Sequence, residues 1–446
     1  MKALAEATRK QGMPFGFYYS QFLDWHEPNG GGNNWDFDES KKDYLKYYHE
    51  KSIPQLKELM TNYGKLGIVW FDMPGGLTKE QTQKLVDSLH KLQPECLFSS
   101  RVGQGLGDYR DFGDSEVPPV PIDDVWESIY THNDSWGYIQ HDMNFKSSKE
   151  IIQLLANVAS KGGNLMLNVG PDSTGNLPYY SVKFLKQTGA WLKQNGESIY
   201  GTTFGFVPAQ PWGVTTGNQD KLYLHVLNVP HDNILLVPSF GSKVSRVYSL
   251  INKKVLSYKQ DEKGLHVALA GLDPKSPDNV FVVEYLGGQQ PYDATAPVTI
   301  SSQFDYCNVD AVFGKTAGNA KTKSVTFSHY FGDWKHATCI TDMQQPQDSV
   351  SFNLRIVEKG DYKILLEYAC PQSSAKQEGV VNVNGNDYYF RTLRTSEYDA
   401  SAPLMFIKHP VATITIDKPG TYTMKVHPTQ QGTELFKLKT VIFEPM

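Results

Sequence analysis

"GIVWFDMPGG", residues 67–76, carries the clearest structural signal in the first part of this sequence. A short apolar run ends on one acid, Asp72, and Met-Pro-Gly-Gly follows directly. The apolar run predicts a buried strand at residues 68–71. Proline and glycine do not continue a strand, so the chain must turn away immediately after the carboxylate. An acid is therefore expected at the carboxyl end of a buried strand.

Strands and helices alternate on both sides of this segment. The alternation implies parallel strands joined by crossover helices. Long polar loops, including the acidic segment 102–138, follow the strands rather than the helices, which is typical of a (β/α) barrel with its active site at the carboxyl ends of the strands. Strands are expected at 14–20, 96–100 and 164–170, and helices at 2–10, 41–63, 79–91, 148–160 and 180–195.

The pattern changes near residue 200, where short segments alternate apolar and polar residues with period 2. Such segments, separated by turn residues, predict antiparallel strands. The expected fold class is multidomain, α/β plus all-β: a TIM-like (β/α) barrel at 1–199, then two antiparallel β-sandwich domains, a small one at 200–287 and a sandwich or jelly roll at 295–446. The aromatic residues of the last domain fit either a carbohydrate-binding module or a spacer: Tyr306, Trp334, Tyr362, Tyr368, Tyr388 and Tyr389.

The composition is that of an ordinary globular protein and excludes several functions. The 446 residues are 40% hydrophobic and 20% charged, with a formal net charge of −5. No basic footprint for nucleic acid or an anionic membrane is present. No apolar run reaches the roughly 18 residues of a membrane span, and "MKALAEATRKQG" is an amphipathic helix rather than a signal peptide. Aromatic residues make up 12%, which suits β-rich cores or stacking on sugars.

The four cysteines, Cys96, Cys307, Cys339 and Cys370, show no spacing typical of a zinc site. A disulfide between Cys307 and Cys339 is conceivable, but the sequence alone does not establish one. No metal or other cofactor is expected.

Asp72 has two interpretations, as a cap for the next turn or as a nucleophile or general base. The strand at 96–100 ends next to Arg101, so the same strand-end rim is expected to hold this arginine. A guanidinium beside the carboxylate would keep it ionised, as a nucleophile requires.

Acids interleaved with aromatic residues fill the segment that follows Arg101. Beside a barrel mouth, this composition is typical of a sugar site. Two carboxyl groups about 5 Å apart, one ionised and one protonated, would give retaining glycoside hydrolysis. The acids of the segment are Asp108, Asp111, Asp114, Glu116, Asp123, Asp124 and Glu127.

Five segments in order resemble the α-L-fucosidases of glycoside hydrolase family 29, over roughly residues 1–230. They are "FGFYYSQFLDW", "GIVWFDMPGG", "LFSSRVGQG", "GDSEVPPVPIDDVWESIYTHNDSWGY" and "GGNLMLNVGPDSTG". The resemblance implies a retaining exo-acting hydrolase of terminal α-L-fucose, with Asp72 as the nucleophile that forms a covalent fucosyl-enzyme intermediate. It also implies pocket positions at Trp70 and Arg101, and at one or both of Tyr18 and Tyr19.

The general acid/base is less defined by the resemblance. Glu116 in "GDSEVPP" is the first choice, and Glu127 beside Trp126 is the second. Four further residues are candidates for substrate binding, the first two with an ordered loop anchor as the equal alternative: Trp25, His26, Trp126 and Trp136.

The resemblance begins late in the family pattern, because only the helix at 2–10 precedes the "YYS" strand. An N-terminally truncated barrel is therefore expected, partly open and with little or no activity, since open sheet edges promote aggregation. Family analogy places the protein outside the cytoplasm, secreted or periplasmic. The linkage preference, the oligomeric state and the ligand of the last domain are not indicated.

Two other functions compete with a fucosidase. One is a non-catalytic glycan-binding protein or inactive truncated homologue that keeps the fold but not the turnover. The other is a retaining hydrolase of a related sugar such as α-L-galactose, because a pocket built around a methyl group rejects an added hydroxyl only modestly.

Overall fold

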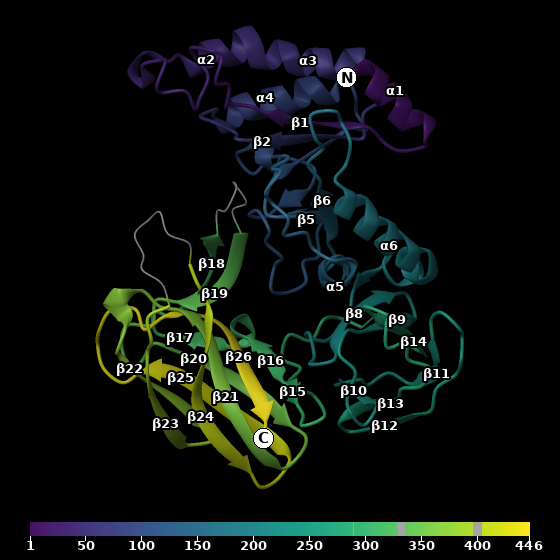
Figure 1. Ribbon diagram of the computed structural model, residues 1–446, viewed down its shortest axis with the longest axis vertical. Helices are drawn as coiled ribbons and strands as arrows, with labels where there is room; N and C mark the ends of the chain where they lie inside the picture. The colour runs from purple at the N-terminus through teal and green to yellow at the C-terminus, as the bar shows by residue number, and fades with distance from the viewer. Residues whose placement is uncertain (289, 329–334, 396–403) are drawn as a thin grey trace. The chain divides into compact units, whose positions relative to one another are not determined.

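The computed structural model describes residues 1–288, 290–328, 335–395 and 404–446. The chain divides into two compact units. The first unit contains residues 1–111 and 124–127, and the second contains 112–123 and 128–446. Figure 1 draws most of the first unit in purple and blue.

A parallel sheet organises the first unit. Its order is β1 (Gly16–Ser20), β2 (Ile68–Asp72), β3 (Leu97–Phe98). The register pairs Ser20 with Asp72, and Ile68 with Leu97. The expected parallel strands are confirmed, and Asp72 is the last residue of β2.

The helices of the first unit cover this sheet and agree with the expected positions, and the one predicted at 41–63 contains a π turn. Leu85 and Leu89 of α4 lie in one buried cluster with Val69 and Phe71 of β2. Thr78 and Gln81 close a capping box at the start of α4, as the sequence predicts. The helices are α1 (Lys2–Lys10), η1 (Glu39–Lys41), α2 (Tyr44–Tyr47), the π-helix η2 (Tyr48–Ser52), α3 (Ile53–Asn62), α4 (Lys79–His90) and η3 (Ser100–Val102).

Residues 44–62 form one uninterrupted helical run made of α2, η2 and α3, which lies within the helix predicted at 41–63. Asp43 caps α2, a single π-helical turn follows, and Pro54 lies in the first turn of α3. Proline has no N–H to donate and its ring crowds the carbonyl four residues before it. The wider π turn directly before Pro54 accommodates this break in the backbone hydrogen bonds of the helix.

The segment 102–138 is not the loop that the sequence predicted. It contains β4 (Arg110–Asp111) and β5 (Trp126–Thr131), which pair in parallel with Asp111 opposite Glu127. Five of the six residues of β5 are buried. The sequence did not predict this strand, because Glu, Ser and Thr interrupt its apolar pattern. In the folded chain these polar side chains have hydrogen-bond partners; Ser128 Oγ, for example, donates to the Glu116 carbonyl.

Chain order and strand order coincide in this α/β part. A parallel bridge between Ser99 and Tyr109 continues the pairing from the end of β3 towards β4, and β6 (Asn164–Asn168) lies next to β5. Helices join β1 to β2 and β2 to β3, as a (β/α) barrel requires, whereas the described residues between β4 and β5 form no helix. The mixed α/β class is confirmed, and the barrel itself stays a prediction.

The second unit begins its regular structure with the end of β5, followed by α5 (Ser148–Ala159), β6, α6 (Tyr179–Asn195) and η4 (Gly196–Ser198). The capping box of Ser147 and Glu150 starts α5 where expected. Ile152 of α5 and Trp191 of α6 share a buried cluster with Tyr223 and Val282 from the strands that follow.

Antiparallel strands make up the rest of the second unit. A five-stranded sheet has the order β11-β14-β9-β8-β7, and a three-stranded sheet has the order β10-β13-β12. Both lie within the predicted small sandwich, whose boundaries stay a prediction. The strands are β7 (Thr203–Phe204), β8 (Gly213–Asn218), β9 (Lys221–Val226), β10 (Ile234–Pro238), β11 (Val244–Ser249), β12 (Tyr258–Asp261), β13 (Gly264–Ala268) and β14 (Asn279–Tyr285).

Two six-stranded sheets follow, with the orders β15-β20-β25-β22-β23, to which β17 adds at β20, and β18-β19-β26-β21-β24, to which β16 adds at β26. In β20, Val350, Phe352, Leu354 and Ile356 are all buried, which is the period of 2 that the sequence shows. The strands are β15 (Val298–Ile300), β16 (Cys307–Asp310), β17 (Lys315–Ala317), β18 (Lys321–Ser328), β19 (Lys335–Thr341), β20 (Ser349–Ile356), β21 (Gly360–Ala369), β22 (Glu378–Val383), β23 (Asn386–Arg391), β24 (Ile407–Ile416), β25 (Gly420–Pro428) and β26 (Lys437–Pro445); the short turns η5 (Ala311–Phe313) and η6 (Gln372–Ser374) complete this part.

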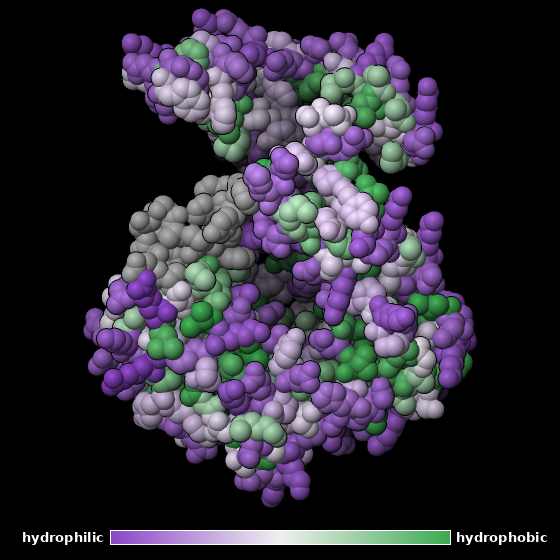
Figure 2. Space-filling model, viewed as in Figure 1, coloured by the Kyte–Doolittle hydropathy of each residue, from purple (hydrophilic) through white to green (hydrophobic). Residues whose placement is uncertain are grey.

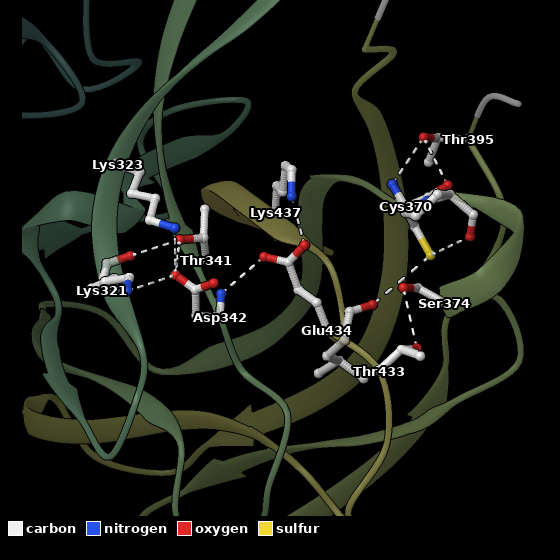
Figure 3. Close-up of polar contacts among 12 residues, drawn as sticks. Lys321, Lys323, Thr341, Asp342, Cys370, Ser374, Thr395, Thr433, Glu434 and Lys437 are labelled. Atoms are coloured by element: carbon white, nitrogen blue, oxygen red, sulfur yellow. Dashed lines mark hydrogen bonds and ion pairs between the residues drawn. The ribbon is translucent and has the colours of Figure 1, made fainter. Parts of the chain in front are cut away.

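The disulfide between Cys307 and Cys339 is not formed. All four cysteines are free and buried. Cys307 Sγ contacts the backbone of Ser301. Figure 3 shows Cys370, whose backbone N–H donates to Thr395 Oγ1 at 3.0 Å. The thiols therefore behave as small apolar core residues.

The aromatic residues of the last part divide between core and surface. Tyr362 and Tyr368 have no exposed surface, whereas Tyr306 and Tyr389 are exposed. Trp334 lies outside the described residues. A carbohydrate-binding role stays a prediction for the exposed pair. Hydrophilic residues cover most of the face drawn in Figure 2, and within the described ranges no helix combines the length and apolar character of a membrane span.

Candidate active site

Asp72 ends β2 with its side chain about one-fifth exposed. From the adjacent strand β1, the Tyr18 hydroxyl donates to Asp72 Oδ2 at 2.8 Å. Burial, and then the hydrogen bond to Asp72, raise the pKa of Tyr18 well above its ordinary value. Tyr18 therefore remains a neutral donor at any physiological pH.

Arg101 binds the other oxygen of Asp72. Arg101 follows the end of β3, and its Nη1 lies 3.3 Å from Asp72 Oδ1. The contact between this arginine and the strand-end acid was expected from the sequence, and it is present. Both oxygens of Asp72 thus receive a donor, which suits an ionised carboxylate because that form only accepts.

Trp70 lies two residues before Asp72, so both side chains share one face of β2. Its ring stacks on Tyr18, with centroids 5.7 Å apart, and the Arg101 guanidinium lies 4.8 Å above the Trp70 ring. Trp70 is only 6% exposed, whereas Tyr18 is 60% exposed. Tyr18 is consequently the aromatic surface of this cluster that a ligand reaches first.

Glu127 lies beneath this cluster, in the first unit. Glu127 Oε1 accepts from Trp70 Nε1, and from the Tyr109 hydroxyl at 3.4 Å. Burial raises the pKa of Glu127 to about 7, with the adjacent Asp111 adding to the rise. A carboxyl group that keeps a proton near neutrality is therefore separated from Tyr18 and Arg101 by the Trp70 side chain.

Glu116 belongs to the second unit. Its Oε2 accepts from the backbone N–H of Gly113 at 2.8 Å. It lines a cavity of about 400 Å³ within that unit, together with Lys146, Lys335 and His336. Its carboxyl group thus closes a local turn while facing open space.

The remaining predicted residues fall outside the Asp72 cluster. Tyr19 points to the opposite face of β1, where its hydroxyl contacts Gln55 Oε1 at 3.0 Å. Trp25 packs edge-on against Trp35, and the His26 backbone donates to Asp24.

The two other tryptophans also lie elsewhere. Trp126 has no exposed surface, so it offers no face to a sugar. Trp136 lies in the second unit, where its carbonyl accepts from Asn168 Nδ2.

Sequence reasoning missed the partners of Glu127. Asp111 was one acid among many in a supposed loop, and Tyr109 was only an aromatic neighbour. The alternation in "DYRD" was the available signal, because Tyr109 and Asp111 flank Arg110 at strand spacing. The pairing of that short strand with β5 could not be read from it.

Residues 1–197 match the family described as Alpha-L-fucosidase. The resemblance stated from the sequence is confirmed over this region. A plasma alpha-L-fucosidase of Rattus norvegicus is 31% identical over 219 residues, which are 45% of this chain and 46% of that protein. The chain spans about half the length of such curated relatives.

Two solved structures extend the comparison. The alpha-L-fucosidase from Vibrio sp. strain EJY3 has a TM-score of 0.74 at 24% identity and covers 100% of this chain and 78% of its own. At that identity the likeness shows the fold alone. Alpha-L-fucosidase isoenzyme 1 from Paenibacillus thiaminolyticus has a TM-score of 0.58 at 28% identity, covering 64% of this chain and 75% of its own. The Asp72 cluster lies wholly inside the alpha-L-fucosidase region.

Proposed function

We propose that this protein is a retaining exo-α-L-fucosidase with Asp72 as its nucleophile. The observation that carries the proposal is the strand-end carboxylate of Asp72, with Tyr18 donating to one oxygen and Arg101 to the other. The family match over residues 1–197 supplies the substrate class. No metal or other cofactor is invoked.

In the first step, an Asp72 oxygen attacks the anomeric carbon of the fucoside, and the bond to the leaving oxygen breaks. That oxygen takes a proton from a carboxylic acid of the protein. In the second step, water gives its proton to the same carboxylate and attacks the anomeric carbon, which releases Asp72. Two inversions at one carbon retain the α configuration.

The proton donor is assigned on the resemblance, to Glu116. Two observations weaken the case for Glu127 as the proton donor. Its Oε1 already accepts from Trp70 and Tyr109, and the residue is only 8% exposed. A general acid must reach the leaving oxygen. Glu116 uses one oxygen for the turn and lines open space.

Tyr18 contributes the stacking face in this proposal. Trp70 is covered by Tyr18 and by the Arg101 guanidinium, so it supports the pocket rather than facing the sugar. The exposed ring of Tyr18 packs against the apolar side of fucose, as aromatic rings do in sugar sites. Its hydroxyl stays on Asp72.

The test is hydrolysis of 4-nitrophenyl α-L-fucoside by the 446-residue chain and by a form extended upstream to the next in-frame start. Asp72→Asn should abolish activity in whichever form is active, and proton NMR should show the α-anomer as the first product. Failure of both forms to turn over, or a β-anomer product, would overturn the proposal.

Chemical rescue identifies the acid. Glu116→Gln and Glu127→Gln are compared with added azide, which replaces an acid/base-activated water as nucleophile in the second step. The acid is the residue whose variant loses about 10²- to 10⁴-fold in rate and regains it as the fucosyl azide. The α-L-galactoside of the same phenol is run beside the fucoside, and faster turnover of the galactoside would favour the related-sugar function.

A further inference from the structure

Two acids meet side by side beneath Trp70. Asp111 on β4 and Glu127 on β5 are direct partners in the parallel register, and both belong to the first unit. Partners in register project their side chains to the same face of a sheet. Two carboxylates at such spacing repel each other when both are ionised.

Each acid accepts hydrogen bonds through one of its two carboxyl oxygens. Asp111 Oδ2 accepts from Ser100 Oγ at 2.9 Å and from the Arg101 backbone N–H at 3.3 Å. Glu127 Oε1 accepts from Trp70 and Tyr109. Asp111 therefore connects to Arg101, which binds Asp72, and Glu127 connects to Trp70, whose ring stacks on Tyr18.

The remaining oxygen of Asp111 lacks a partner. Asp111 Oδ1 is a buried atom to which no described group donates. A buried acceptor without a hydrogen bond is costly, and more so when it carries charge. The side chain opposite is Glu127, which becomes a donor once its carboxyl group is protonated.

We propose that Glu127 and Asp111 share one proton, and that this acid pair positions Trp70 and Arg101 around Asp72. The proton lies on Glu127 and is donated to Asp111 Oδ1. Glu127 is then a positioning residue and not the catalytic acid. The kinetic part of this proposal rests on the proposed function, whereas the structural part does not.

The pair makes the cluster sensitive to pH. The groups facing Glu127 are Asp111, the Tyr109 hydroxyl and Trp70 Nε1, with the Arg101 guanidinium above the indole. The pKa of Glu127 is raised to about 7 by burial first and by Asp111 next. Because the folded pKa exceeds the unfolded one, the folded state binds the extra proton. The stabilisation is complete below the ordinary glutamate range and is lost as the pH rises through about 7.

The decisive variant is Glu127→Gln. Its amide oxygen accepts from Trp70 and its NH₂ group donates to Asp111 Oδ1, so the contacts persist without a titrating proton. Rates at the optimum should stay within about threefold of the parent, whereas an acid/base residue would lose about 10²- to 10⁴-fold. The fall in rate on the alkaline side should move to higher pH. Glu127→Ala should lose both the contacts and the rate.

A second measurement does not need turnover. Thermal unfolding is followed from pH 5 to 9 for the parent, for Glu127→Gln and for Glu6→Gln, an exposed control on α1. The parent and the control should lose stability as the pH rises through about 7, and Glu127→Gln should show a flatter profile. Indole fluorescence, with Trp70→Phe subtracted, should change over the same range in the parent and in Glu6→Gln but not in Glu127→Gln.

Two results would overturn the inference. One is azide rescue of a severely slowed Glu127→Gln, which would make Glu127 the acid. The other is an unfolding profile of Glu127→Gln that parallels the parent and the control across the whole pH range. If no form hydrolyses fucoside, the proposed function fails while the unfolding and fluorescence profiles still decide the acid pair.

Discussion

Two buried carboxyl groups in this molecule have opposite neighbours. Glu127 in the first unit lies beside another acid, Asp111. Asp278 in the second unit lies beside a base: His225 Nδ1 is 2.7 Å from Asp278 Oδ2, and both side chains are fully buried. Each carboxyl residue also receives an indole N–H, from Trp70 at the Glu127 side chain and from Trp191 at the Asp278 carbonyl.

Thr216, His225 and Asp278 form a hydrogen-bonded row of hydroxyl, imidazole and carboxylate, as in a catalytic triad. Unlike a catalytic triad, this row is closed to substrate, because all three residues are buried. His225 Nε2 lies 3.1 Å from Thr216 Oγ1, and that hydroxyl donates to the Ser198 carbonyl at 2.7 Å. Both ring nitrogens are thus occupied, and Thr216 has no exposed surface. The row joins strands β8 and β9 to the segment before β14, so its role is to hold the fold.

The partner of each buried acid, Glu127 or Asp278, determines its role. An acid paired with a base needs no proton exchange, and it stabilises a closed interior. An acid paired with an acid holds a proton that leaves near neutrality, and it lies against residues that contact a part-exposed carboxylate. The first arrangement predicts effects on stability alone, and the second predicts effects on activity and pH dependence.

The largest expected effect tests the activity side of this comparison. Asp72→Asn removes the nucleophile while keeping a similar shape, so kcat should fall by at least about 10³-fold. The melting temperature should stay within about two degrees of the parent. The measurement is hydrolysis of the aryl fucoside together with thermal unfolding. Asp87→Asn on the outer turn of α4 is the matched control, and equal losses in both variants would contradict the assignment of Asp72.

The next effect tests the stability side. Asp278→Ala leaves His225 buried without its carboxylate, and removing one partner of a buried pair costs about 3–5 kcal/mol. Urea unfolding should therefore show a large loss, whereas the rate per folded molecule should be unchanged. Asp261→Ala, at an ion pair near the surface with His266, should cost far less, because solvent screens exposed pairs. If Asp278→Ala lowered the rate of fully folded protein, the division between the two regions would be wrong.

A smaller effect sharpens the assignment of Tyr18. Tyr18→Phe keeps the ring and deletes the hydrogen bond to Asp72, which as a bond to a charged group contributes about 1.5–3 kcal/mol. The expected fall in kcat/KM is about 10- to 100-fold. Tyr19→Phe is the control, because its hydroxyl contacts Gln55 and the Ser52 carbonyl on the other face. Equal losses in the two variants would show that the contact with Asp72 is not what matters.

The smallest effect concerns the thiols. All four cysteines are free and buried, so reduction should leave the melting temperature unchanged within error. Thermal unfolding with and without dithiothreitol measures this, and a thiol count under denaturing conditions is the control. A reductant-dependent drop would show that a disulfide, rather than packing and the Asp278 pair, holds the second unit.

The parallel sheet and the capping boxes were predictable because they depend on neighbours along the chain. The apolar run into Asp72 required a strand that stops, and Thr78 with Gln81 required a helix that starts. Arg101 could be placed near Asp72 because Asp72 ends one strand and Arg101 follows the end of the adjacent parallel strand. The resemblance then added the substrate class, which the alternation of elements does not contain.

The strands at 110–111 and 126–131 were not predictable in the same way. Their sequences are short and polar, and they become strands only because partners and a buried environment are present. The sequence left a disulfide between Cys307 and Cys339 open, and the structure has both thiols free. Sequence spacing does not report whether two thiols face each other.

Residue order alone indicates where β2 ends, which acid ends it and which family the first 197 residues match. These properties follow from local periodicity, from proline and glycine, and from the order of motifs. Three other properties could be seen only in the folded chain: Asp111 faces Glu127, Tyr18 rather than Tyr19 contacts Asp72, and Asp278 pairs with His225. They depend on strand register and burial, which arise when distant segments pack and water is excluded between them.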